Sequence, residues 1–205
     1  MKKMVDFGQA VKYLKAEIES RFGDKGLARH SLSVAEFSRR LAESQGRPDT
    51  ELEKIYLAGL AHDLFKGYGA ESLELHVQAE SVPADIETLR IGGGLLHGPA
   101  AAHYLRSRLG ISDTELLALV YYHTTSRADA NRLEKIFFCV DYLDPAREMR
   151  KSEMDAVFLR EKIIESLDKV YREVLYRKIV HTLAKGKALH PNAVAAWNES
   201  CCQRV

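Results

Sequence analysis

The chain has 205 residues, of which 46% are hydrophobic, so it can form one well-packed core and does not require a second. Its 30 basic and 29 acidic side chains nearly cancel, which argues against a broad basic surface for nucleic acid. The longest apolar runs fall far short of the roughly 20 residues that span a bilayer, and the N-terminus lacks the apolar core of a signal peptide. We therefore expect a cytoplasmic protein that binds neither nucleic acid nor membranes.

Helical periodicity runs through almost the whole sequence, and no alternating pattern indicates a strand of useful length. The five prolines fall where helices are expected to start or stop. We predict an all-α helical bundle forming a single domain over residues 1–205, with its core at about 25–145 and helices at about 153–199 packed on it. The predicted helices cover residues 4–21, 27–45, 50–65, 70–79, 83–90, 97–109, 113–123, 131–143, 153–185 and 191–199.

Several helix ends have identifiable sequence signals. Gly110 is suited to end a helix in the left-handed conformation. Ser112 and Glu115 have the spacing of a capping box, in which each side chain bonds the backbone of the other residue. The three glycines at 92–94 follow no strand, so we interpret them as a mobile loop that could act as a lid rather than as a phosphate cradle.

Histidines and aspartates are concentrated at helix ends and on inward helix faces. His30 shares a face with apolar residues of its helix, and the His62–Asp63 pair ends an apolar run. Asp141 follows the apolar segment IFFCV, where an unpaired carboxylate would be costly to bury. Imidazole and carboxylate groups that converge in a helical bundle suit transition metals, so we predict a metal site. Its expected ligands are His30, His62, Asp63, His97, His123 and Asp141.

The remaining histidines lack this setting, and we interpret them as surface or ordinary structural residues. They are His76, His103, His181 and His190. Because His190 precedes a proline, we expect it at the start of the last helix. Three cysteines form no CxxC-type zinc pattern, and Cys139 is expected to be a buried thiol.

The order of these residues resembles a known family. A histidine, a His–Asp doublet and a distant aspartate are similar to the HD-domain superfamily of metal-dependent phosphohydrolases, matched here by His30, His62, Asp63 and Asp141. The segments HDLFK, HGP, YHTTSR, LEKI, DYLDPAR and HPNAVAAWN resemble its YqeK-type branch, whose members are symmetrical diadenosine tetraphosphate hydrolases. The resemblance extends over about residues 29–198. It implies an enzyme that hydrolyses diadenosine tetraphosphate symmetrically to two ADP.

The resemblance also implies which residues bind each of two metal ions. His30, His62, Asp63 and Asp141 would hold one ion, and His97, His123 and a bridging Asp63 would hold the second. Two divalent or trivalent ions, iron first and manganese, cobalt or zinc as alternatives, would activate a water as the nucleophile. Asp63 and Lys66 are the expected catalytic residues, with Lys66 a candidate proton donor to the leaving ADP.

Polyphosphate substrates need positive and hydroxyl donors beside the metals. The candidates are Lys66, Thr124, Thr125, Arg127 and, more weakly, Arg147. Each has a structural alternative, because Lys66 could complete a helix end and the threonines could bond the backbone. Arg127 could pair with Asp129 or Glu134 at the surface. Aromatic candidates for contact with adenine are Phe65, Tyr68, Tyr121 and Tyr122.

The ligand set alone leaves other functions open. An HD phosphohydrolase that acts on mononucleotides or deoxynucleoside triphosphates would need the same residues, and so would a di-iron oxygenase on the same scaffold. A non-catalytic nucleotide sensor is a further alternative, although such sensors usually lose a ligand. In each case the expected partner is a small nucleotide or metabolite, and the long helix predicted at 153–185 could support a homodimer.

Overall fold

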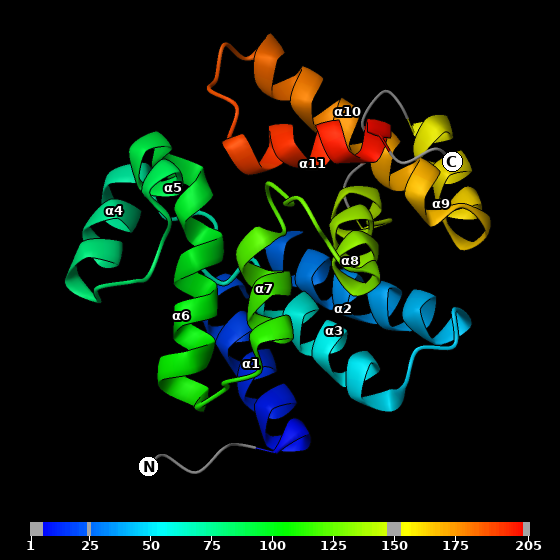
Figure 1. The fold of residues 1–205 in the computed structure, drawn as a ribbon. Helices are drawn as coiled ribbons and strands as arrows, with labels where there is room; N and C mark the ends of the chain where they lie inside the picture. The colour runs from blue at the N-terminus through cyan, green and yellow to red at the C-terminus, as the bar shows by residue number, and fades with distance from the viewer. Residues whose placement is uncertain (1–5, 24–25, 147–152, 203–205) are drawn as a thin grey trace.

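The computed structural model describes residues 6–23, 26–146 and 153–202, and in these ranges the chain is helical with no β-strand (Figure 1). The all-α prediction is confirmed. None of the helices in these ranges is long and apolar enough to cross a membrane. The elements are α1 (Phe7–Phe22), α2 (Gly26–Ser44), α3 (Asp49–Ala61), α4 (Ala70–Ala79), α5 (Ile86–Ile91), the 3₁₀ turn η1 (Gly93–Leu96), α6 (His97–Leu109), α7 (Thr114–Tyr122), α8 (Arg132–Leu143), α9 (Glu153–Glu165), α10 (Leu167–Ala184) and α11 (Pro191–Cys202).

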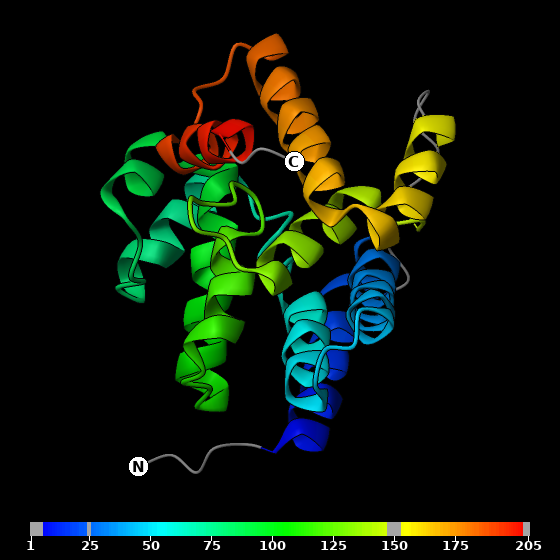
Figure 2. The same cartoon turned by 45° about the vertical axis from the view of Figure 1, so that its right-hand side comes forward.

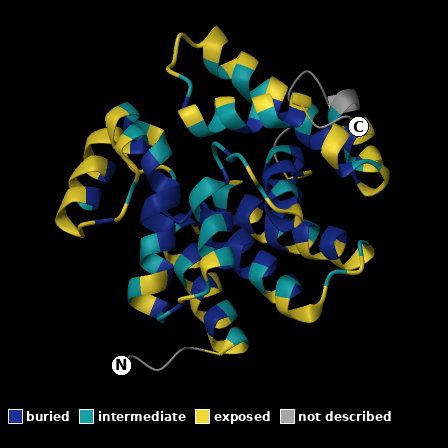
Figure 3. Ribbon diagram, in the orientation of Figure 1, coloured by how far each residue is buried: buried dark blue, intermediate teal, exposed yellow. Residues whose placement is uncertain are grey.

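Helix α3 is the central element of the bundle. It contacts α1, α2, α6, α7 and α8, and every residue from Ile55 to Ala61 is buried. A helix surrounded by neighbours has no solvent-facing stripe, which is why this segment is apolar on all sides. The buried residues in Figure 3 gather around it. The end of α3 therefore brings the His62–Asp63 pair into the middle of the molecule.

Helices α2 and α3 pack unusually closely, and Gly59 makes this possible. A Cβ atom at Gly59 would lie 2.4 Å from Cα of Ala35, a separation that real atoms cannot reach. The missing side chain lets the two backbones approach each other. His30 on α2 and His62 after α3 consequently come within contact of one another.

The predicted helix over 50–65 is too long, because α3 ends at Ala61. From His62 to Gly67 the chain forms tight turns, in which the backbone N–H groups of Leu64 and Lys66 bond the carbonyls three residues earlier at 3.1 and 2.9 Å. Such i→i+3 bonds overwind the chain relative to an α-helix. The side chains of His62 and Asp63 therefore do not follow the α-helical directions that a helix over 50–65 would give them.

The link between α6 and α7 confirms one predicted signal and corrects another. Gly110 ends α6 in the left-handed conformation, with φ 67°. The capping box predicted for Ser112 and Glu115 is wrong, because Asp113 caps α7 and its carboxylate accepts a backbone N–H at 2.9 Å. Asp is as good a cap as Ser, and here it starts the helix one residue later.

The long helix predicted over 153–185 is also wrong, because Ser166 divides it into α9 and α10. Ser166 has φ −146° and ψ 64°, far from helical values, and Asp168 follows in the first turn of α10. The break lets both helices bury apolar residues, among them Ile163 and Leu167. Helix α10 packs on α8 and α11, and the α10–α11 pair lies across one end of the bundle (Figure 2).

Replacement of Gly59 by Ala should destabilise the fold. Overpacking against Ala35 outweighs the roughly 1 kcal/mol that Ala gains in helix propensity, so the free energy of unfolding should fall by at least about 1 kcal/mol. Gly26→Ala is the matched control, because a Cβ there meets no atom within 4 Å. Urea denaturation of both variants measures the difference. Equal stability of Gly59→Ala and wild type would contradict the close approach.

Candidate metal centre

Six side chains expected to bind metal come together at the core of the bundle. They arrive from five places: the start of α2, the turn after α3, the first residue of α6, the residue after α7 and the last turn of α8. All six are buried, with His62 and Asp63 at 0% exposure. The six residues are His30, His62, Asp63, His97, His123 and Asp141.

Asp63 divides this cluster into two groups. Its Oδ2 lies 3.4 Å from Nε2 of both His30 and His62. Its Oδ1 lies 3.3 Å from Nε2 of His97 and 3.6 Å from Nε2 of His123. Asp141 completes the first group. One carboxylate therefore faces two separate sets of possible metal ligands, and each set has at least three members when Asp63 itself is included.

Asp141 Oδ1 lies 3.2 Å from His30 Nε2 and 3.6 Å from His62 Nε2. Two ligands that each bind one ion at about 2.1 Å lie about 3.0–3.4 Å apart. The spacing in the first group is thus close to what a shared ion requires.

All four histidine rings are oriented by a bond from their outer nitrogen. In three of them Nδ1–H donates to the backbone carbonyl three residues earlier, from His62 to Gly59 at 2.9 Å, from His123 to Val120 at 2.7 Å and from His97 to Gly94. His30 Nδ1–H donates to Asp144 at 2.6 Å. This tautomer is assigned from the acceptors, and it leaves Nε2 of each ring as a lone pair directed at the centre.

The lone pairs of these side chains are arranged to bind cations and not to bind one another. Nε2 of His97 and Nε2 of His123 are 2.8 Å apart, although both nitrogens are acceptors in this tautomer. Oδ1 of Asp63 is fully buried and has no hydrogen-bond partner in the described residues. Converging lone pairs and a buried unpaired carboxylate oxygen are costly unless a positive ion lies between them. The residues therefore fit two metal ions.

The environment sets the charge of these groups. Although burial lowers the pKa of His30, its bonds to Asp141 and Asp144 outweigh this and raise it to about 10. Burial is dominant at His123, where it lowers the pKa to about 3 and keeps the imidazole neutral. Burial alone would raise the pKa of Asp63, but the surrounding histidines together have the larger effect and lower it to well below its usual range. Only neutral imidazole and ionised carboxylate bind metals, so His123 and Asp63 already have the required form, whereas a metal that binds to His30 must displace its proton.

Asp144 is a site residue that sequence reasoning missed. It is buried, and its second oxygen accepts from the Ser33 hydroxyl while the first accepts from His30. It stands three residues after Asp141 in DYLDP, so the two carboxylates share one helix face. That spacing is the signal that could have identified it as the partner of a ligand histidine.

Lys66 lies at the edge of the centre. Its Nζ donates to Oδ2 of Asp63 at 2.6 Å, and its side chain is 39% exposed. Since α3 ends at Ala61, Lys66 does not cap that helix, and the structural alternative considered for it is not what the structure shows. The ammonium group reaches both the buried carboxylate and solvent, while its role toward phosphate stays a prediction.

The other phosphate candidates have different surroundings. Thr124 Oγ1 lies 3.2 Å from His123 Nε2, and the Thr125 hydroxyl donates to a neighbouring carbonyl at 2.9 Å. Arg127 makes two bonds to Glu134, at 2.8 and 3.0 Å, which is the ion pair expected as its alternative. Arg147 lies outside the described residues. Thr125 thus makes the backbone bond expected as its alternative, and Thr124 is the best placed of these candidates.

Glu134 is fixed in place by a helix cap, so its carboxylate is available where Arg127 can pair with it. Its side chain accepts from the backbone N–H of Asn131, and the Asn131 side chain accepts from the Glu134 N–H, forming a capping box at the start of α8. This box was not among the predicted helix starts. The Arg127 pair thus extends a helix cap.

Three of the four aromatic candidates for adenine pack in the core or lie away from the two ligand groups, while Tyr68 is 46% exposed and stays a prediction. Phe65 is buried and stacks on His76, with ring centroids 4.8 Å apart. Tyr121 donates its hydroxyl to Asp85 at 3.0 Å. Tyr121 and Tyr122 line a cavity of about 240 Å³ between α6 and α7 that includes none of the six ligand candidates. None of these contacts favours adenine binding.

Lys178 on α10 is a second residue that the sequence did not reveal. Its Nζ lies 3.8 Å from Oδ2 of Asp141 and donates to the backbone carbonyl of His123 at 3.2 Å. No motif surrounds it, and α10 lies beside the centre because it packs against α8. A signal for it would have required the tertiary structure.

Comparisons with known proteins agree with this geometry. A family model described as HD domain matches residues 27–173. A symmetrical bis(5'-nucleosyl)-tetraphosphatase of Halalkalibacterium halodurans is 28% identical over 193 residues, which cover 94% of this chain and 95% of that one. Another of the same name, from Staphylococcus aureus, is 31% identical and covers 82% of this chain and 84% of its own.

A solved structure has the same fold. It is described as a predicted HD superfamily hydrolase involved in NAD metabolism from Clostridium acetobutylicum, and it superposes with a TM-score of 0.81 at 28% identity. The superposition covers 98% of this chain and 100% of the other. The arrangement of helices around the centre is thus shared over essentially the whole length.

Replacement of Asp63 by Ala should remove both ions, because each group loses an oxygen of the shared carboxylate. We expect about two ions per chain in wild type and almost none in the variant after reconstitution and desalting. Atomic emission gives the content, and circular dichroism checks the fold. Asp168→Ala, at an exposed residue of α10, should retain both ions. A full metal content in Asp63→Ala would disprove the bridging role.

Replacement of Asp144 by Asn should weaken metal binding without removing a ligand. The amide is a poorer acceptor for His30 Nδ1–H, and loss of such outer partners typically costs about 10–100-fold in metal affinity. Competition with a chelating dye measures the dissociation constant. Asp49→Asn at the exposed start of α3 is the control. An unchanged affinity in Asp144→Asn would mean that Asp144 does not support the ligand.

Proposed function

The chain belongs to the HD domain family, and from this membership we propose that it is a metal-dependent hydrolase that cleaves diadenosine tetraphosphate symmetrically to two ADP. The observation that carries the proposal is the Asp63 carboxylate, whose oxygens face two separate groups of histidines. The two reported relatives are each named symmetrical bis(5'-nucleosyl)-tetraphosphatase and are similar over most of their length.

The two ligand groups define what each side of the centre would hold. Oδ2 of Asp63 would bind one ion together with His30, His62 and Asp141, and Oδ1 would bind the other with His97 and His123. When bound, two such ions supply an activated water and neutralise the charge of a phosphate under attack. Iron suits this histidine-rich, carboxylate-bridged set, with manganese, cobalt and zinc as alternatives.

The chain's own residues would bind and orient the polyphosphate. Lys66 holds its protons at Nζ beside Asp63, at the boundary between the buried centre and solvent. From there the ammonium group can pair with a phosphate oxygen or donate a proton to the leaving ADP. Thr124 places a hydroxyl next to His123, on the other side of the shared carboxylate. Thr125, Arg127 and Arg147 complete the proposed phosphate-binding set, although Arg127 is paired with Glu134 and Arg147 lies outside the described residues.

The competing functions have less support. The relatives carry the name of a dinucleoside polyphosphate hydrolase, which favours this substrate class over mononucleotides, deoxynucleoside triphosphates and an oxygenase reaction. A sensor without activity usually lacks a ligand, and here all six side chains are present and buried. The hydrolase is therefore the function that the site supports best.

The proposed function also bears on where the protein acts. A nucleotide substrate supports a cytoplasmic location. A homodimer would account for apolar side chains that α9 leaves exposed, Phe158 at 55% and Ile164 at 58%. A single domain over residues 1–205 also stays a prediction.

The reaction can be tested with purified protein, supplied separately with iron, manganese, cobalt or zinc. We expect diadenosine tetraphosphate to give two ADP, at the same rate with and without dioxygen, because hydrolysis needs only water. Chromatography of the products measures the outcome, with ATP and deoxynucleoside triphosphates as comparison substrates. An intact substrate, or products AMP and ATP, would contradict the proposal. Strict dependence on dioxygen would favour the oxygenase.

A further inference from the structure

Residues 92–94 are three consecutive glycines, and the proposed reaction gives them no task. They join α5 to η1, where Gly92 has φ 64° and ψ −153° and Gly93 has φ 56°. Glycine adopts such angles readily, but it loses more conformational freedom on folding than any other residue. The segment therefore needs contacts from outside itself to keep one conformation.

The conformation of this segment matters to the metal centre. The carbonyl of Gly94 accepts from Nδ1–H of His97, and Nε2 of the same ring lies 3.3 Å from Oδ1 of Asp63. His97 is one of the two histidines in the second ligand group. A shift of Gly94 would therefore turn a ligand candidate away from the carboxylate that both groups share.

Bonds within the segment give η1 little support. The backbone N–H of Leu95 donates to the Gly92 carbonyl at 3.3 Å, beyond the usual range of about 2.7–3.2 Å. The first N–H groups of a helix are often satisfied by the side chain of the residue before it. In η1 that residue is Gly92, which has no side chain. A cap for η1 has to come from another part of the chain.

Glu74 on α4 supplies this cap. Its Oε1 accepts from the backbone N–H of Gly93 at 3.1 Å. The approach is close, because a Cβ atom at Gly92 would lie 2.8 Å from the same oxygen. Glycine at position 92 thus permits both the backbone angles and the contact with Glu74.

Helix α4 is placed for this contact. It packs against η1, and it buries Leu73 and Val77, which stand on either side of Glu74 in the sequence. In Figure 1, α4 and α5 lie together at one side of the bundle. The buried residues fix α4, so the Glu74 carboxylate reaches the glycine segment from a stable helix.

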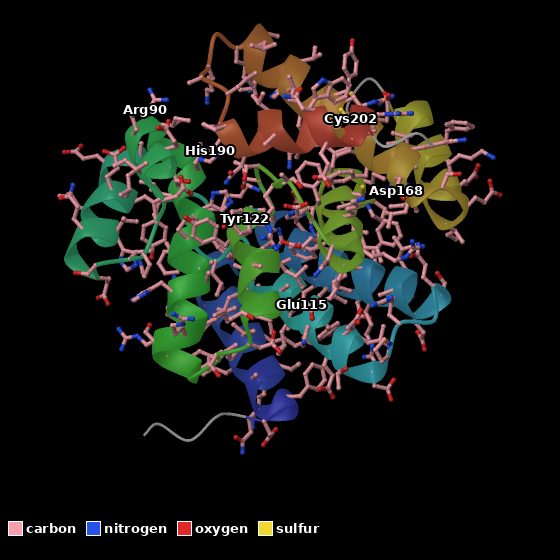
Figure 4. The ribbon with its side chains drawn as sticks, in the orientation of Figure 1. Arg90, Glu115, Tyr122, Asp168, His190 and Cys202 are labelled. Atoms are coloured by element: carbon pink, nitrogen blue, oxygen red, sulfur yellow. The ribbon has the colours of Figure 1, made fainter. Side chains whose placement is uncertain are left out.

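The charges around this segment argue against phosphate binding by its N–H groups. Glu74 already occupies the position that an anion would take at the N–H of Gly93. Arg90 is the one Lys or Arg between residues 70 and 91, and it extends into solvent (Figure 4) and pairs with Glu87 at 2.6 Å. That stretch offers no further Lys or Arg to neutralise a phosphate beside Glu74. The segment therefore acts through contacts within the protein.

We propose that Glu74 is a positioning residue for the second metal ion, the one assigned to Oδ1 of Asp63, His97 and His123. Glu74 fixes η1 from α4, and η1 presents the Gly94 carbonyl to His97. This ring in turn keeps Nε2 directed at Oδ1 of Asp63. The use of that ion in catalysis rests on the proposed function, whereas the series of contacts from Glu74 to Asp63 is a feature of the structure alone.

Stepwise addition of cobalt to metal-free protein, in competition with a chelating dye, measures the affinity for each ion. His97→Ala identifies the phase that belongs to the second ion. Glu74→Ala should weaken that ion by about 10-fold, at the low end of the roughly 10–100-fold cost of losing an outer partner, and leave the first ion unchanged. Ala is a strong helix former, so α4 should stay intact. Glu74→Gln keeps an oxygen acceptor and should retain most of the affinity.

Glu71→Ala is the matched control, because Glu71 is exposed one turn earlier on α4. It should bind both ions as wild type does. Gly92→Ala should weaken the second ion as Glu74→Ala does, since its Cβ would displace Oε1. Gly69→Ala should not, because a Cβ there meets no atom within 4 Å. Thermal melting shows whether each variant is folded.

Wild-type affinity for the second ion in Glu74→Ala would overturn the proposal. So would an equal loss of affinity for both ions, which would indicate a general loosening of the fold. A loss in Glu74→Gln as large as that in Glu74→Ala would contradict the role of the side-chain oxygen as acceptor.

Failure of this proposal and of the proposed function can be told apart, because metal titration needs no hydrolysis. If Glu74→Ala weakens the second ion alone but wild type leaves diadenosine tetraphosphate intact, the proposed function is overturned and the role of Glu74 stands. If wild type produces two ADP while Glu74→Ala keeps full affinity for the second ion, the role of Glu74 alone is overturned.

Discussion

The buried carboxylate of Asp63 is the constraint on which the rest of the structure depends. Its side chain has no exposure to solvent, and one of its oxygens lacks a hydrogen-bond partner in the described residues. Such a group is tolerated only if positive charge is supplied nearby. Lys66 supplies positive charge at Oδ2, and the histidine pairs on either side, His30 with His62 and His97 with His123, would supply more by binding two cations. The apolar helix α3, the contact at Gly59 and the turn after Ala61 all serve to place this one group.

The ends of the helices orient the site. His62, His97 and His123 each stand at or next to a helix boundary, where the carbonyl three residues earlier is available as an acceptor. In a helix interior these carbonyls would bond backbone N–H groups instead. The turn η1, which contains part of the triple glycine, provides the acceptor for His97. A segment that the sequence suggested as a mobile lid thus orients a ligand candidate.

Residues that interrupt a local pattern or belong to a motif could be predicted from the sequence. Residues that reach the site only through the packing of distant segments could not. The His62–Asp63 doublet and Asp141 interrupt apolar patterns, so their polar character alone indicated a site. Lys178 interrupts nothing, because a lysine on an amphipathic helix is ordinary. Asp144 had a usable spacing signal, but its partner His30 lies 114 residues away in the sequence. The break at Ser166 depends on how α9 and α10 share the core, which periodicity does not contain.

The central claim is that Asp63 joins two metal sites. The most direct measurement is a crystal structure of metal-loaded protein, with diffraction collected on both sides of the absorption edge of the bound metal. The account predicts two anomalous peaks, one beside Oδ2 near His30, His62 and Asp141, and one beside Oδ1 near His97 and His123. A single peak, or two peaks that do not share Asp63, would contradict it.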